Sequence, residues 1–135
     1  MTRFASLALV LLLSTVVGCA PATSGSSIAV SDVKSLSGKW LGYATGPSAG
    51  APIPFELTIN PDGTWTSHSG AQVQNGVVRL NDGKIRFERG AASGPSTTVL
   101  QASTAVLEER GGKRVLVGQG RSDYGPYSYE FTEQK

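Results

Sequence analysis

Short runs of alternating hydrophobic and polar residues, separated by turn residues, fill most of the chain. The clearest run is residues 52–60, in which Ile53, Phe55, Leu57 and Ile59 fall on one face and polar residues fall on the other. This period of two is typical of a half-buried β-strand, because successive side chains of a strand point to opposite faces of the sheet. We therefore expect a strand here.

Similar runs, rich in β-branched residues, recur along the chain. They span residues 36–46, 64–69, 77–80, 84–88, 97–101, 105–109, 114–120 and 126–133. Turns are expected at residues 60–63, at Asn75-Gly76, which suits a type I′ hairpin, and at the segments "NDGK" and "RGGK". Beyond residue 18, no segment keeps apolar residues at helical spacing over the length of a helix. We expect an all-β fold, an antiparallel up-and-down meander of about eight strands that forms a small barrel or a sandwich.

The N-terminal region has a different composition. Residues 1–18 combine Arg3, an apolar run and small residues before Cys19, which is the layout of a cleaved secretory signal. The apolar run is shorter than the roughly 20 residues that a transmembrane helix needs. Residues 19–35 are rich in Ser, Ala and Pro, and we expect them to form a flexible tether. One globular domain then covers residues 36–135.

The residues around the only cysteine carry a resemblance. Val16, Val17, Gly18 and Cys19 resemble the bacterial lipobox. In lipoproteins of that class, the cysteine sulfur receives a diacylglycerol, a peptidase cuts before the cysteine, and the new amino terminus is usually acylated too. Two or three acyl chains would hold the protein lastingly on a membrane. Ala20 stands where the family's inner-membrane retention signal places Asp, so the resemblance implies an outer-membrane lipoprotein whose domain faces the periplasm.

A second resemblance lies at the start of the domain. Gly38-Lys39-Trp40 is similar to the Gly-x-Trp that opens the first strand of lipocalins and related calycins, where the tryptophan packs across the closed end of a barrel. Residues 121–125, "RSDYG", are loosely similar to a second lipocalin motif, with Thr replaced by Ser. The chain is shorter than a typical lipocalin and shows no sign of its C-terminal helix. The resemblance implies a calycin-like barrel that Gly38 and Trp40 help to close.

Two motifs of catalytic type occur in unsuitable contexts. Ser48 lies in a G-x-S-x-G sequence, but the strand pattern that follows leaves no place for the helix of a nucleophile elbow. Residues 31–34 match S-x-x-K within the expected tether, without the partner motifs of that chemistry. The single histidine, His68, is expected on the solvent face of a strand, whereas a zinc site needs several ligands. We expect no catalytic residue, no metal and no cofactor.

The charge of the chain is close to balanced. It has 12 Lys and Arg against 10 Asp and Glu, and one of the basic residues, Arg3, lies in the expected signal. A nucleic-acid-binding domain normally carries a strong basic excess. We therefore expect no nucleic acid among the partners.

These observations favour a non-catalytic, membrane-anchored binding module for a small apolar or amphipathic ligand. Its expected ligand or partner contacts are Tyr43, Trp65, Tyr127 and Tyr129. Trp65 lies near an expected turn, where it can face solvent, a ligand or a partner, whereas we expect Trp40 to be buried. A small barrel can hold one ligand or be filled by its own side chains, and the sequence leaves both open. The alternative function is protein interaction, as an envelope scaffold or an inhibitor of a secreted hydrolase.

Overall fold

One antiparallel sheet and a short 3₁₀ helix make up the domain. The computed structural model describes residues 25–47, 49–90, 102–122 and 124–135. The elements in chain order are β1 (Ser26–Ile28), η1 (Val33–Leu36), β2 (Gly38–Thr45), β3 (Ile53–Ile59), β4 (Thr64–Ser69), β5 (Gln72–Asn81), β6 (Lys84–Arg89), β7 (Ala102–Arg110), β8 (Lys113–Ser122) and β9 (Gly125–Gln134).

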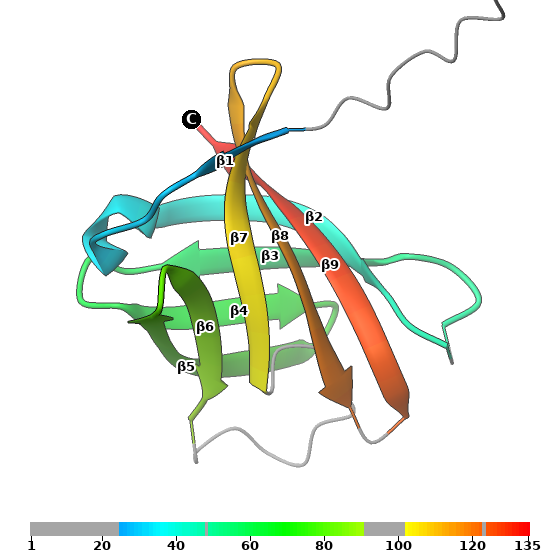
Figure 1. The fold of residues 1–135 in the computed structure, drawn as a ribbon. Coiled ribbons are helices and arrows are strands. Elements are labelled where there is room, and N and C mark those ends of the chain that lie inside the picture. Colours follow the sequence, from blue (N-terminus) through cyan, green and yellow to red (C-terminus); the bar gives the residue numbers. More distant parts are fainter. Residues whose placement is uncertain (1–24, 48, 91–101, 123) are drawn as a thin grey trace, which may run out of the picture.

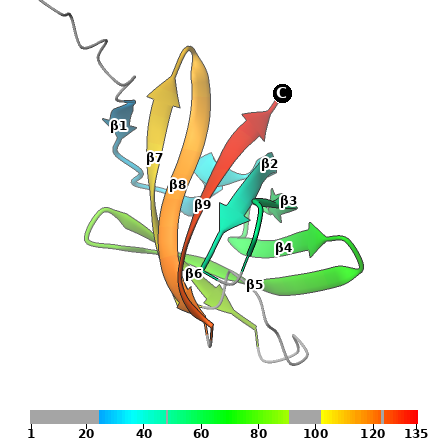
Figure 2. The ribbon, with the colours of Figure 1, turned by 90° about the vertical axis from the view of Figure 1, so that its right-hand side faces the viewer.

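Strands β2 to β9 form a closed barrel of eight antiparallel strands, and β1 is an additional strand. Each barrel strand pairs with the next one along the chain, and β9 returns to pair with β2, where Gly42 lies opposite Phe131. Figures 1 and 2 show these strands wrapping around one interior. The expected all-β meander is confirmed. The β2–β9 pairing makes it a barrel and not a sandwich.

The two ends of the barrel differ in how the chain crosses them. At one end, which we call the closed end, tight turns join β3 to β4, β5 to β6 and β7 to β8, and η1 packs beside the β3–β4 turn. Val33 of η1 lies beside Gly63 in the β3–β4 turn, and Leu36 of η1 is fully buried. At the other end, which we call the open end, connections join β2 to β3, β4 to β5, β6 to β7 and β8 to β9.

Trp40 organises the closed end. Its side chain is 0% exposed, and its indole Nε1 donates a hydrogen bond to the Leu36 carbonyl oxygen over 3.0 Å. The guanidinium carbon of Arg114 lies 5.5 Å from the centre of the Trp40 ring, within the range of a cation–π contact. Arg114 also donates hydrogen bonds to the Ser35 carbonyl oxygen over 2.6 Å and to Glu133 over 2.8 Å. Together these contacts join η1, β2, β8 and β9.

Part of the expected tether is folded onto the barrel. β1 pairs with the last part of β7, and Val30 is buried in the core. β7 continues past Ala105, where its pairing with β6 ends, so β1 covers an edge of β7 that would otherwise be unpaired. A flexible tether over the whole of residues 19–35 is therefore wrong from residue 26 onward. Three residues of strand are too few to show an alternating pattern in the sequence.

The chain from Gly25 onward contains the complete barrel. The buried hydrophobic core begins at Val30 and ends at Phe131, and all eight barrel strands lie beyond Gly38 or begin there. A soluble form that starts after Cys19 therefore retains every residue of this core.

The expected type I′ turn at Asn75-Gly76 is wrong. Both residues lie within β5, and the β4–β5 turn is instead Gly70-Ala71, where Gly70 has a φ of 59°. Gly76 lies opposite Trp65, and a Cβ at this position would come within 2.7 Å of the indole ring. This glycine makes room for a large side chain and does not form a turn.

Several expectations fall outside the described residues: the signal (residues 1–18), the lipobox residues Val16, Val17 and Gly18 with Cys19, the loop residue Ser48, and the strand at residues 97–101. Within the ranges that the structure does describe, no helix is long and apolar enough to cross a membrane.

Candidate functional site

Aromatic side chains from different walls meet in the middle of the barrel. Phe87 of β6 and Tyr129 of β9 have ring centroids 6.2 Å apart, although β7 and β8 separate these strands in the sheet. Phe87 also packs edge-on against Trp65 at 6.1 Å, and Phe131 packs against Phe55 at 6.4 Å. An eight-stranded barrel is just wide enough for side chains to fill. Among the described residues, the protein's own side chains therefore fill the middle of the barrel, which is one of the two possibilities that the sequence left open.

Four inward-facing aromatic residues each lie directly opposite a glycine on the neighbouring strand. The pairs are Trp65 with Gly76, Phe131 with Gly42, Tyr129 with Gly118, and Tyr127 with Gly120. A Cβ at Gly118 or Gly120 would collide with the paired tyrosine ring. Glycine inside a strand marks such close approaches. At Gly76, Gly118 and Gly120 it lets the ring lie across the neighbouring strand, whereas a Cβ at Gly42 would meet the backbone of β9. The sequence carried this signal as alternating glycines in one strand and alternating aromatics in the next.

The open half of the barrel is more polar inside than the closed half. Ser67, Gln74 and Ser103 are buried polar residues with exposed fractions of 1%, 3% and 3%. Each lies near the open end of its strand. Burying a polar group without a hydrogen bond costs free energy, so buried polar side chains usually have a hydrogen-bond partner in the protein or in a ligand.

Ser103 and Tyr129 form one of these buried polar contacts. Their hydroxyl oxygens are 2.9 Å apart and share a hydrogen bond. Burial raises the pKa of Tyr129 well above its usual value, while the bond to Ser103 acts in the opposite direction more weakly. The Tyr129 phenol therefore stays protonated at neutral pH, as a neutral part of the core.

Trp65 is as deeply buried as Trp40. Their exposed fractions are 1% and 0%, so the expectation that Trp65 is the more exposed of the two is wrong. The cause is the pairing of Trp65 with Gly76, which lets the indole lie inside the wall. The two indoles differ in their N–H groups, because that of Trp65 has no hydrogen-bond partner among the residues that the structure describes.

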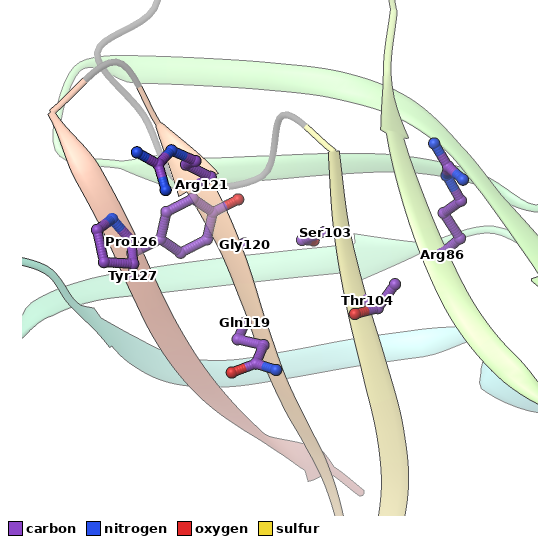
Figure 3. A pocket seen from close by; sticks show the side chains of 8 residues that line it. All are labelled: Arg86, Ser103, Thr104, Gln119, Gly120, Arg121, Pro126 and Tyr127. Carbon is purple, nitrogen blue, oxygen red and sulfur yellow. The ribbon is translucent and has the colours of Figure 1, made fainter.

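A pocket of about 500 Å³ lies at the open end, and we call it the rim pocket. Figure 3 shows the Tyr127 ring lying across β8 at Gly120, with Arg121 and Arg86 on opposite sides of the pocket. The inward-facing Tyr127 and Ser103 meet outward-facing residues here because the strands end at this rim. The lining residues are Arg86, Ser103, Thr104, Gln119, Gly120, Arg121, Pro126 and Tyr127.

The rim pocket combines three kinds of group. Ser103, Thr104 and Gln119 supply hydroxyl and amide groups for hydrogen bonds, while Tyr127 supplies an aromatic surface. The two arginines add positive charge and planar hydrogen-bond donors. Pockets of a few hundred Å³ with apolar surface and a few placed polar groups are typical of small-molecule sites.

The sequence-predicted contacts do not come together in one site. Tyr127 lines the rim pocket, whereas Tyr129 and Trp65 are part of the filled interior. Tyr43 is 48% exposed on the outer face of β2. Gly38 and Trp40 are the predicted closure residues, and both lie on β2, with Trp40 buried at the closed end.

The remaining lining residues were missed by the sequence reasoning. Arg86, Ser103, Gln119 and Arg121 come from three strands, β6, β7 and β8, and share no motif. Only the pairing of those strands brings them together.

His68 is exposed on the outer face of β4, as expected. In the part of the chain that the structure describes, no three His, Cys, Asp or Glu side chains gather in a way that could hold a metal ion.

The rim pocket is therefore defined by geometry alone. No protein family, curated protein or solved structure compared with this chain matches it.

Proposed function

We propose that this protein is a lipid-anchored, non-catalytic binding module of the cell envelope that takes a small amphipathic ligand in its rim pocket. The observation that carries the proposal is the pocket of about 500 Å³ at the open end, in which the Tyr127 ring, hydrogen-bonding side chains and two arginines meet. A filled interior directs a ligand to this rim, because the barrel centre is occupied by Phe87, Tyr129 and their neighbours. Neither a metal nor a cofactor is needed for such a role.

The anchor in this proposal rests on the lipobox resemblance of residues 16–19. We expect Cys19 to carry the lipid, the protein to sit in the outer membrane and the domain to face the periplasm. Labelled fatty acid fed to the host should appear on the mature protein and be lost in Cys19→Ala. Label that persists in this variant would contradict the lipoprotein assignment.

Binding in the rim pocket is tested with native mass spectrometry. A soluble form starting at residue 20, secreted by its own host, should copurify with a small molecule. Gln119→Trp places a bulky side chain at the pocket, so we expect the bound fraction to fall strongly. Gln134→Trp makes the same change on β9 at the closed end and should leave binding unchanged. Equal occupancy in both variants, or no bound molecule in the parent protein, would overturn the proposal.

A second candidate function is protein interaction, and exposed apolar side chains on β2 favour it. Leu41 and Tyr43 are 44% and 48% exposed on the outer face, and the exposed Pro54 lies opposite Tyr43. Exposed apolar groups that cluster in this way mark protein contacts. Crosslinking in the host should then capture one defined protein, and Tyr43→Ala should abolish that capture. Capture that is unchanged in Tyr43→Ala would remove this candidate.

A further inference from the structure

A second hollow of about 380 Å³ lies on the outside of the barrel wall beside the rim pocket, and we call it the wall pocket. Thr104 and Gln119 line both hollows. The lining residues of the wall pocket are Lys84, Thr104, Ala105, Val106, Val117, Gly118, Gln119 and Ser128.

The strand register explains why the two hollows adjoin. Arg86 is paired with Thr104, Thr104 with Gln119, and Gln119 with Ser128, so these outward side chains form one row across β6 to β9. Val106 and Val117 are opposite one another in the next row. Directly opposite residues in an antiparallel sheet have Cβ atoms about 5 Å apart. The rim pocket and the wall pocket are therefore two parts of one groove.

The groove is positively charged. Among the described residues that line its two parts, Lys84, Arg86 and Arg121 are basic and none is acidic. Glu130 lies opposite Val117 and is paired with Arg110 at 2.8 Å. The Glu88 carboxylate lies 3.5 Å from Arg86 Nε, but it also binds Arg79 at 2.9 Å. Two guanidinium groups therefore share one carboxylate beside the groove, which leaves an excess of positive charge.

The wall pocket supplies the apolar part of the groove. Val106 is 39% exposed, and Val117 beside it is half-buried. Gly118 has no side chain and Ala105 has only a methyl group, so neither adds a polar side chain to the wall. An apolar strip thus continues from a rim that carries arginines on both sides.

We infer that this groove binds one elongated anionic amphiphile, an alkyl chain with a phosphate or carboxylate group. The anionic group lies between Arg86 and Arg121, and the chain lies over Val106 and Val117. Guanidinium groups match carboxylate and phosphate oxygens through paired, charge-assisted hydrogen bonds. The inference rests on the proposed function and adds to it the charge and shape of the ligand.

Isothermal titration of the soluble form starting at residue 20 tests the inference, with monomeric dodecyl phosphate, dodecanol and inorganic phosphate as probes. Dodecyl phosphate should bind more tightly than either of the others. The double variant Arg86→Gln/Arg121→Gln should lose about tenfold or more in affinity for dodecyl phosphate, because two charge-assisted contacts are removed. Its affinity for dodecanol should not change. Lys39→Gln is the control, since Lys39 is exposed on β2 and lines neither hollow, and should bind all probes like the parent.

A third variant separates the two parts of the groove. Val106→Asn should weaken the binding of dodecyl phosphate and leave the binding of inorganic phosphate unchanged. Equal binding of dodecyl phosphate by the parent and the double variant would overturn the inference. Binding of an acidic peptide that depends on Arg86 and Arg121 but not on Val106 would also overturn it. If the double variant binds dodecyl phosphate like the parent while Gln119→Trp still abolishes binding of dodecanol, the proposed function stands without this inference. Failure of all three probes, with no copurified molecule, would overturn both.

Discussion

The closed and open ends of this barrel are built from different groups. At the closed end, Trp40 is fully buried, its N–H is bonded to Leu36, and Arg114 covers its ring. At the open end, the interior contains buried polar side chains such as Ser67 and Ser103, and a pocket of about 500 Å³. Proteins commonly place binding sites where packing and polar satisfaction are locally incomplete. The two ends therefore differ in packing: Trp40 fills and hydrogen-bonds the closed end, whereas the open end contains buried polar groups and a pocket.

The longest connections lie at the open end, although the β4–β5 turn there spans only residues 70–71. The β5–β6 turn spans only residues 82–83 and the β7–β8 turn only residues 111–112, both at the closed end. At the open end, β6 ends at Arg89 and β7 begins at Ala102, and a long connection also joins β2 to β3. Longer connections on a rigid scaffold frequently carry function.

The largest expected effect concerns the two tryptophans. Trp40→Ala should lower the free energy of unfolding by about 3–5 kcal/mol, because it removes a fully buried ring that is also hydrogen-bonded. Trp65→Ala also creates a cavity, but it removes an indole N–H that has no partner among the described residues, so its cost should be smaller. Urea denaturation followed by circular dichroism measures both. Equal or reversed losses would show that the Trp40 hydrogen bond does not distinguish the two tryptophans.

Leu36→Ala tests whether η1 belongs to the closed end energetically. Leu36 is fully buried, so its truncation should cost about 2–5 kcal/mol. Val33→Ala, at a half-buried position on the same helix, is the control and should cost less. The two urea midpoints give the answer. A midpoint unchanged by Leu36→Ala would mean that residues 33–36 behave as a tether after all.

Two glycines of β8 sharpen the comparison along a single strand. Gly118→Ala should destabilise the protein by about 1–3 kcal/mol, because its Cβ would collide with the ring of Tyr129 in the packed interior. Gly120→Ala should cost less, since Tyr127 lies at the rim and its ring has the pocket beside it. Thermal unfolding of both variants measures the order. A larger loss for Gly120→Ala would show that the rim is as tightly packed as the centre.

The smallest expected effect is a pH dependence at the closed end. Hydrogen bonds from the Thr64 hydroxyl and backbone N–H to the Asp62 carboxylate hold the pKa of Asp62 below its usual value. A lowered folded-state pKa stabilises the protein above the unfolded pKa of about 4, and this contribution is lost as the pH falls through the folded value. Asp62→Asn should therefore flatten the acid limb of the stability curve slightly, as measured by urea unfolding at several pH values.

Thr64→Val provides the control for that effect. It removes the hydroxyl donor and keeps the Asp62 carboxyl group, so it should reduce the same pH dependence. An acid limb that is unaltered in both variants would mean that this turn contributes nothing to acid stability.

Local patterns in the sequence were sufficient for the fold class and most strands. The alternation around Phe55 gave β3, and the glycines of the β3–β4 and β5–β6 turns, Gly63 and Gly83, do have positive φ values of 86° and 74°. Glycine was misleading inside strands, as at Gly76, because the same residue serves a turn and a close approach of an aromatic ring. Sequence position alone does not distinguish these two uses.

The candidate site was less accessible from the sequence. Of the four predicted contacts, Tyr127 lines the rim pocket, while Tyr129, Trp65 and Tyr43 lie elsewhere. Tyr127 and Tyr129 share one inward face of β9, and nothing in the alternation tells which of the two reaches the rim. That depends on how many residues of β9 extend beyond the filled centre.

The sequence by itself determined which residues alternate, where most turns fall and that the fold is all-β, because these properties depend on near neighbours in the chain. Only the tertiary structure decided that the sheet closes into a barrel, that β1 covers the edge of β7, that the interior is filled and that a groove runs across β6 to β9. These features depend on which distant strands become neighbours and on whether large side chains face glycines. The physical reason is that a period of two is set locally by the backbone, whereas a pocket or a filled core is set by the register between strands that are distant in the sequence.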